Sequence, residues 1–219
     1  MRYEIFGEFA QFVRLTLAEG ESVWASKGGI MSHTDGIDWR PRLPGGIAAA
    51  ARRIVAGAGA SLTRIEARQP EAAVSLTSRE PGRIFVWQLD DGAVVTARGS
   101  FLAGWGDLDI TFMVARRAGA ALFGGAGVFL QRISGRGTVL VHASGQLDDR
   151  RLAAGEVLTV GTGHVAAFAA GVDYDIRYVG GLRKALFGGE GLFMTRLTGP
   201  GRVLLQSVKR KRELRVQAG

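Results

Sequence analysis

Apolar and polar side chains alternate over short stretches of this chain, and turn residues separate the stretches. The clearest stretch, Asp107–Val114, places polar and apolar residues with a period of two. Successive side chains of a β-strand point to opposite faces, so this pattern predicts a strand with one buried face. Shorter runs rich in β-branched residues, such as Val94–Ala97 and Val157–Val160, predict further strands. The pattern therefore indicates a mainly β fold.

A few segments have helical character instead. Residues Gly45–Val55 contain a run of alanine and arginine, which favour helix, with glycine close to both ends. Residues Val114–Phe123 and Leu182–Phe187 are shorter stretches at corresponding places. We expect a few short helices here.

The chain repeats part of its own sequence. Residues 120–132 read AALFGGAGVFLQR and residues 184–196 read KALFGGEGLFMTR, at an offset of 64 residues. A fainter copy covers residues 57–65. Such self-similarity is typical of a fold built from equivalent units. We expect one β domain over residues 1–207, made of three tandem units at about 1–80, 81–145 and 146–207.

Glycine marks the places where strands are expected to turn. The chain holds 33 glycines, and this residue is favoured where φ is positive or where backbones approach closely. Gly135 and Gly137 separate two strand-like runs, and Gly199 and Gly201 do the same further along. The two pairs predict β-hairpin turns.

The composition narrows the class of protein. Without cysteine the chain forms no disulfide, thiolate metal site or cysteine nucleophile, and a reducing compartment is favoured. The opening residues MRYEIFGE lack the features of a secretion signal. No stretch reaches the roughly 20 apolar residues that a transmembrane helix needs. We expect a cytoplasmic protein with no transmembrane segment.

The formal net charge is +8, and half of this excess lies in the segment 208–219. Lys209, Arg210, Lys211 and Arg212 follow one another there, with almost no apolar residues. This composition predicts a flexible basic C-terminal tail that folding does not require. The remaining body is only mildly basic, so the total charge does not by itself indicate a nucleic-acid-binding face.

The residue types of catalytic and metal sites do not form a recognisable pattern. The three histidines, His33, His142 and His164, lack the close spacing of common metal sites. The chain has no Gly-x-Ser-x-Gly segment, and its Gly-rich runs lack the Lys-Ser/Thr of a phosphate-binding loop. We expect no enzyme activity, no metal and no cofactor.

Arginine occupies the same place in each repeat, as Arg64, Arg132 and Arg196. Such a guanidinium can brace its own hairpin by donating to turn carbonyl groups, which is the interpretation we favour, or it can bind an anion or a partner. The candidate contacts for an anion or partner are Arg64, Arg132, Arg196, Lys209, Arg210, Lys211 and Arg212.

The repeated pattern Leu-Phe-Gly-Gly-x-Gly-x-Phe-x-x-Arg-x-x-Gly-x-Gly-x-Val resembles that of a known family. Together with Tyr3-Glu4-Ile5 and Thr162-Gly163-His164, it is similar to the bacterial branch of the altered-inheritance-of-mitochondria family, number twenty-four, over about residues 1–207. The resemblance implies units like the trp RNA-binding attenuation protein, of the short double-stranded β-helix or β-sandwich type, and a ring-like homotrimer. Mitochondrial members are associated with inner-membrane organisation, and no catalytic residues carry over.

These observations favour a non-enzymatic structural or interaction scaffold with an unknown protein partner. A small unit of amphipathic strands leaves sheet edges open, and a homo-oligomer can pair them. The alternative is a ring protein that binds RNA or another anion, suggested by the implied fold and the basic tail. RNA readers stack bases on exposed aromatic side chains, whereas the repeated Phe129 and Phe193 stand among apolar neighbours. An enzyme is the least favoured reading.

Overall fold

The computed structural model describes residues 1–42, 44, 62–115, 128–178 and 193–210. The strands of the first part are β1 (Arg2–Phe6), β2 (Phe12–Leu17), β3 (Ser22–Ala25), β4 (Ile30–His33), β5 (Ile37–Arg42), β6 (Leu62–Ala67) and β7 (Ala72–Thr77). The next are β8 (Gly82–Gln88), β9 (Val94–Ala97), β10 (Phe101–Ala115) and β11 (Val128–Ser144). The last are β12 (Leu147–Leu152), β13 (Val157–Gly161), β14 (Val165–Ala169), β15 (Asp173–Tyr178), β16 (Phe193–Thr198) and β17 (Gly201–Gln206). Two 3-10 turns, η1 (Leu89–Asp91) and η3 (Thr162–His164), complete the described elements.

The mainly β fold expected from the alternating pattern is confirmed. The helix expected from Val114 is wrong at its start, because Val114 and Ala115 are the last residues of β10 and pair with Phe129 and Val128 of β11. Strand pairing along this long hairpin outweighs the weak local preference for helix. The rest of that segment, and the segments 45–55 and 182–187, lie outside the described residues.

The same strand partners recur in three consecutive stretches, which we call the N unit (β2 to β7), the middle unit (β8 to β11) and the C unit (β12 to β17). In the N unit β7 lies between β2 and β4, and β6 lies between β3 and β5. In the C unit β17 lies between β12 and β14, and β16 lies between β13 and β15. The long strands β10 and β11 of the middle unit serve both sheets, together with β8 and β9. Each unit therefore contributes two sets of three antiparallel strands. β1 extends one set of the N unit to a four-stranded sheet, and sets of neighbouring units join in one ten-stranded sheet.

A register shift falls at the same place in every unit. It lies between Ile30 and Ser32 in β4, between Phe101 and Ala103 in β10, and between Val165 and Ala167 in β14. The residues that bulge out are thus Met31, Leu102 and Ala166. These shifts allow the units to be compared residue by residue. The likeness of a unit to the trp RNA-binding attenuation protein stays a prediction.

The Gly-x-Gly segments carry the chain from one sheet of a unit to the other. β11 runs unbroken through Gly135 and Gly137, and Gly137 lies opposite Gly106 of β10. β16 and β17, on either side of Gly199, pair with other strands and not with each other in the described sheets. The hairpin turns predicted at these glycines are therefore wrong. The glycines are needed because backbones cross closely there, and a Cβ on Gly135 would lie 2.0 Å from the carbonyl oxygen of Asp107.

We expect Gly135→Ala to destabilise the fold by about 2–4 kcal/mol, because the added methyl meets backbone at a φ of +108°. Gly155→Ala is the matched control: Gly155 has a φ of +77° and open space around the added carbon. The control should cost only about 1 kcal/mol, from the backbone conformation alone. Urea denaturation of both variants measures the difference, and equal losses would contradict the close crossing.

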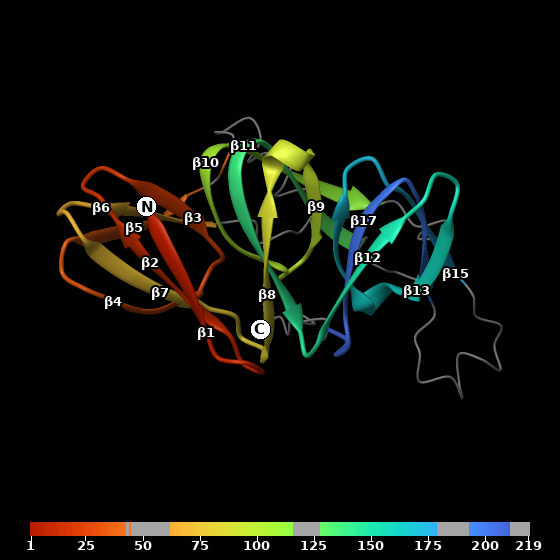
Figure 1. The fold of residues 1–219 in the computed structure, drawn as a ribbon, viewed down its shortest axis with the longest axis horizontal. Coiled ribbons are helices and arrows are strands. Elements are labelled where there is room, and N and C mark those ends of the chain that lie inside the picture. Colours follow the sequence, from red (N-terminus) through yellow and green to blue (C-terminus); the bar gives the residue numbers. More distant parts are fainter. Residues whose placement is uncertain (43, 45–61, 116–127, 179–192, 211–219) are drawn as a thin grey trace, which may run out of the picture.

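The three units stand in a row (Figure 1), and neighbouring units share their cores. The N-unit core is completed by Ile84 and Leu140 of the middle unit, and the middle-unit core by Ala166 and Leu204 of the C unit. The sheet formed by β8, β11 and the start of β10 is consequently covered on both faces. Leu140 packs into the N-unit core, whereas its neighbours Val139 and Val141 pack into the middle-unit core. No described helix has the length and apolar character to cross a membrane.

Candidate functional site

The three repeated arginines occupy equivalent positions on the middle strands β6, β11 and β16. Arg64 lies opposite Trp24, Arg132 opposite Val95, and Arg196 opposite Thr159. Arg64 and Arg132 are not brought together. Trp24 also lies opposite Gly104 of β10, whereas Arg132 lies opposite Thr111 of the same strand, seven residues further on. At about 3.3 Å per residue, roughly 23 Å of strand separates the two positions, so they do not form one anion site.

Arg64 contacts the surface of its own sheet. Its guanidinium donates to the hydroxyl of Ser22, and its Cζ lies 4.9 Å from the centre of the Trp24 ring. Partial burial lowers the pKa of Arg64 from its ordinary value. The described contacts of Arg64 are therefore with Ser22 and Trp24 of β3, and the bracing of a hairpin by the repeated arginines stays a prediction. The stacking of the Arg64 guanidinium on the Trp24 indole is a cation–π contact that packs the side chain against its own sheet.

The start of the basic tail is docked against the body, contrary to the expected flexible tail. The Val208 amide donates to the carbonyl oxygen of Ser144 (3.1 Å). The stem of Lys209 lies over Gly163, where an added Cβ would meet it at 3.5 Å. Arg210 then points back into the molecule. Composition could not show this docking, because the surfaces that receive the tail come from distant parts of the chain. Lys211 and Arg212 lie outside the described residues.

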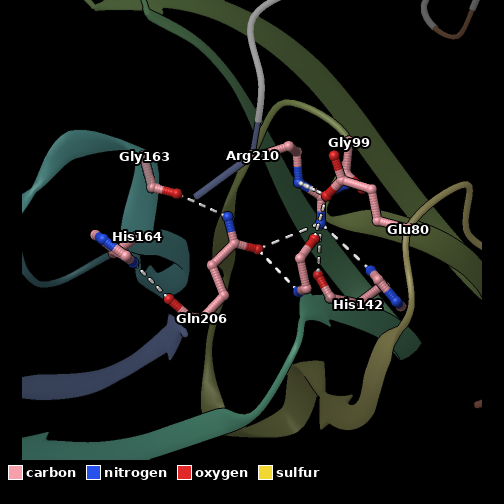
Figure 2. Close-up of polar contacts among 8 residues, drawn as sticks. Glu80, Gly99, His142, Gly163, His164, Gln206 and Arg210 are labelled. Carbon is pink, nitrogen blue, oxygen red and sulfur yellow. Dashed lines mark hydrogen bonds and ion pairs between the residues drawn. The ribbon is translucent and has the colours of Figure 1, made fainter. Parts of the chain in front are cut away.

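Arg210 enters a polar cluster between the middle and C units (Figure 2). One arm of its guanidinium, Nη1, donates to the carbonyl oxygen of Gly99. The other arm, Nη2, donates to the carbonyl oxygen of His142 and to Oε1 of Gln206, both at 3.3 Å. Its Nε lies 3.9 Å from Oε2 of Glu80, beyond hydrogen-bond distance. The Arg210 side chain keeps only 17% of its surface exposed, and this burial lowers its pKa. We call Glu80, Gly99, His142 and Gln206 the arginine cradle.

His142 is the buried titratable group of this cradle. Its exposed fraction is 1%, and its Nδ1 lies 3.3 Å from Nη2 of Arg210. Burial, and then the positive charge of Arg210, lowers the pKa of His142 to about 4, while Glu80 acts in the opposite direction. Nε2 of His142 has no hydrogen-bond partner among the described residues. The imidazole is therefore neutral at neutral pH.

Hydrogen bonds hold the cradle in shape from the side of the body. The Ser144 amide donates to Oε1 of Gln206 (3.0 Å), and Nε2 of Gln206 donates to the carbonyl oxygen of Gly163 (2.8 Å). The Ser144 hydroxyl donates to Glu80. These contacts connect the segment before β8, the end of β11 and the end of β17. The arrangement offers carbonyl and carboxylate oxygens to a cation.

A shallow depression lies next to the cradle, at the free end of the C unit. Its volume is about 320 Å³. It is lined by Gln146, Leu147, Asp148, Val160, Gly161, His164, Leu205, Gln206 and Ser207. Nδ1 of His164 is hydrogen-bonded to the backbone oxygen of Gln206 (2.8 Å), which places the imidazole at its wall. Within the described ranges, no group of three or more His, Asp or Glu side chains is arranged to hold a metal ion.

Comparison with known proteins connects this architecture to a family. The model of the family described as mitochondrial biogenesis AIM24 matches residues 3–208, which includes all of β1 to β17 except Arg2. The chain belongs to the AIM24 family. An uncharacterized protein of Streptococcus pyogenes serotype M6 is 28% identical to this AIM24 chain over 204 residues, covering 90% of this chain and 81% of the relative.

A solved structure has the same overall fold as this chain. The X-ray crystal structure of a Streptococcus pyogenes protein superposes with a TM-score of 0.79 at 25% sequence identity. The superposition covers 95% of this AIM24 chain and 94% of the other. The resemblance inferred from the repeated glycine-rich motif is therefore confirmed at the level of family and of mainly β fold.

Sequence reasoning selected Arg210 but missed the residues that receive it. The residues next to Glu80, His142 and Gln206 in the sequence form no recognisable binding motif, and none of the three falls in the repeated motif. One signal exists in hindsight. His142 and Gln206 occupy equivalent positions in the middle and C units, since they pair with the equivalent residues Ile84 and Leu147. At both positions a polar residue interrupts a run of apolar residues.

Proposed function

We propose that this protein is a non-enzymatic scaffold that assembles head to tail through β4 and β13, closes into a homotrimeric ring, and presents its outer surface to a protein partner. The observation that carries this proposal is the way the units are already joined within one chain. Ala103 and Gly104, just after the β10 shift, pair with Ala25 and Trp24 of the N unit. Ala167 and Phe168, just after the β14 shift, pair with Thr96 and Val95 of the middle unit.

The same two strand positions remain open at the ends of the row. Within the described residues β4 pairs only with β7, and β13 pairs only with β16. β4 is the N-unit equivalent of β14, and β13 is the C-unit equivalent of β9. Open strand edges favour pairing with another chain, so a second copy that docks β4 against β13 would extend the existing pattern.

Burial at the equivalent positions supports this contact. Leu102 and Ala166, at the register shifts of β10 and β14, are fully buried in the core of the preceding unit. Met31, at the shift of β4, is 51% exposed. Val141 is likewise buried by the following unit, whereas Leu205, its C-unit equivalent, lines the open depression. A second copy would place Met31 at this depression.

The internal junctions also fix the register that the contact should have. Each repeated arginine has a cross-strand partner, Trp24 for Arg64 and Val95 for Arg132. At both junctions the first residue after the register shift pairs with the residue that follows this partner in sequence: Ala103 with Ala25, and Ala167 with Thr96. Applied to the open ends, this rule places Ser32 opposite Val160 and His33 opposite Thr159 of the next chain. Three chains follow from the family resemblance, and light scattering should then give about three times 23.3 kDa. A monomer that persists at micromolar concentration contradicts the proposal.

RNA or anion binding is a weaker proposal, because its candidate residues are used elsewhere or separated. Arg210 is engaged inside the chain, and the strand register keeps Arg64 far from Arg132. We therefore expect filter binding with single-stranded RNA to show no tight complex at physiological salt. Tight binding that falls steeply over a salt series would instead support the phosphate contacts of an RNA-binding protein.

A further inference from the structure

We propose that the arginine cradle is a guanidinium-binding site, and that Arg210 fills it in cis as a releasable latch that holds the basic tail against the body. The cradle gathers oxygen acceptors from residues far apart in the sequence. The carbonyl oxygen of Gly99 serves one arm of the guanidinium, and the His142 carbonyl and Gln206 Oε1 serve the other. The Glu80 carboxylate adds a negative charge at the rim.

The geometry selects arginine over lysine. Acceptors for the two arms lie on different walls, one from the turn before β10 and the others from the ends of β11 and β17. A planar fork of donors reaches both walls at once, whereas an ammonium group is a single point of charge. Gly99 is part of this fit. Its φ is +79°, and an added Cβ would lie 2.6 Å from Nη1 of Arg210.

The cradle keeps its shape without the tail. Gln206 Oε1 also accepts from the Ser144 amide, Gln206 Nε2 donates to Gly163, and Glu80 accepts from the Ser144 hydroxyl. Every one of these partners belongs to the body of the protein. Emptying the site would therefore leave its acceptors oriented, which is the property of a preformed binding site.

The contacts of Arg210 are also suited to release. Two of its hydrogen bonds are long, at 3.3 Å, and its buried Nε has no hydrogen-bond partner among the described residues. Burying a cation whose donors are not all satisfied is unfavourable. Arg210 lies only four residues beyond the end of β17, so it can leave without disturbing a strand. Release would free the first basic residues of the tail for an acidic partner surface.

The direct test adds the tail in trans. A chain ending at Ser207 is titrated into a labelled peptide with the sequence of residues 208–219, and fluorescence anisotropy measures binding. We expect a one-to-one complex that Arg210→Ala in the peptide weakens at least about tenfold, since two or more bonds to a charged group are lost. Arg212→Ala, which removes the same charge two residues further on, should change the affinity by less than about twofold at physiological salt. Equal losses for the two peptides, or no binding by a folded truncated chain, would overturn the site.

A second measurement uses the full chain, so that the test does not depend on folding of the truncated one. Gly99→Ala blocks the cradle without altering the tail, and Gly20→Ala is its control, with the same φ of +79° and nothing within 4 Å of the added carbon. Displacing Arg210 removes a positive charge from beside His142, so nuclear magnetic resonance should show the His142 pKa rising from about 4 in Gly99→Ala only. An unchanged titration in Gly99→Ala would show that Arg210 does not occupy a site of this kind.

Discussion

Replacing His33 by proline should convert the assembled protein into a monomer of 23.3 kDa. The reason lies in which way the backbone of β4 points. The Thr34 amide donates to the carbonyl oxygen of Ala73 in β7 (2.9 Å). Backbone groups of neighbouring residues alternate in direction along an antiparallel strand, so the N–H of His33 faces the open edge. Proline removes this donor and leaves the pairing of β4 with β7 in place.

His33→Ala is the matched control for this experiment. It removes the exposed imidazole but keeps the backbone N–H, and it should therefore remain assembled. Light scattering coupled to size exclusion gives the mass of both variants, and circular dichroism establishes that both are folded. Equal masses for the two variants would show that the edge of β4 takes no part in assembly.

Met31 provides an independent check of the same contact. Met31→Glu places a charge where the neighbouring chain should bury an apolar side chain, so we expect loss of the assembled mass. Trp39→Glu is a suitable control, because Trp39 is similarly exposed but lies on β5. A trimer that tolerates Met31→Glu as well as Trp39→Glu would require a different interface.

Acid should destabilise the protein by about 3 kcal/mol between pH 6.5 and pH 4 through His142 alone. The folded state holds the His142 pKa at about 4, against an ordinary value of 6.5. Below pH 6.5 the His142 side chain is therefore protonated in the unfolded chain but still neutral in the folded one, so protonation favours unfolding. The loss grows as the pH falls towards 4 and is constant below it. Arg210 and Glu80 are the charged groups that act on His142, with opposite effects on its pKa.

His142→Gln should remove this dependence on pH. Glutamine occupies the equivalent place in the C unit, as Gln206, and it does not titrate. Urea denaturation at half-unit steps of pH gives the free energy of unfolding for both proteins. The curve of the variant should be nearly flat between pH 6.5 and about 5.5, above the range in which carboxylates with ordinary pKa values take up protons. A variant with the slope of the natural protein would place the titration at another group.

The sequence predicts the mainly β class because alternation and β-branched runs are local properties. It also places Arg64, Arg132 and Arg196 at equivalent positions, since the motif that contains them is repeated. It fails at Gly135 and Gly137, because a glycine pair looks the same whether the chain reverses or crosses to a second sheet. Only the approach of Gly106 from β10 decides between the two.

The cradle could not be found in this way for a similar reason. Arg210 reaches Gly99, 111 residues earlier in the chain, and such a contact leaves no local pattern. The burial of His142 is hidden as well. A strand with one solvated face shows alternating polar and apolar residues. β11 is covered on both faces around Leu140 and Val141, so its sequence does not alternate there and does not indicate that His142 is buried.

The shared sheets have a consequence for how the chain folds. Leu140 and Val141 are neighbours in β11, yet one belongs to the N-unit core and the other to the middle-unit core. Val203 and Leu204 of β17 are divided between two cores in the same way. In repeat proteins the cooperativity of unfolding depends on the strength of the interfaces between neighbours relative to the intrinsic stability of each unit. Here each core contains residues of a neighbouring unit, so we expect the three units to unfold together as one cooperative unit and none of them to be exchanged or lost alone.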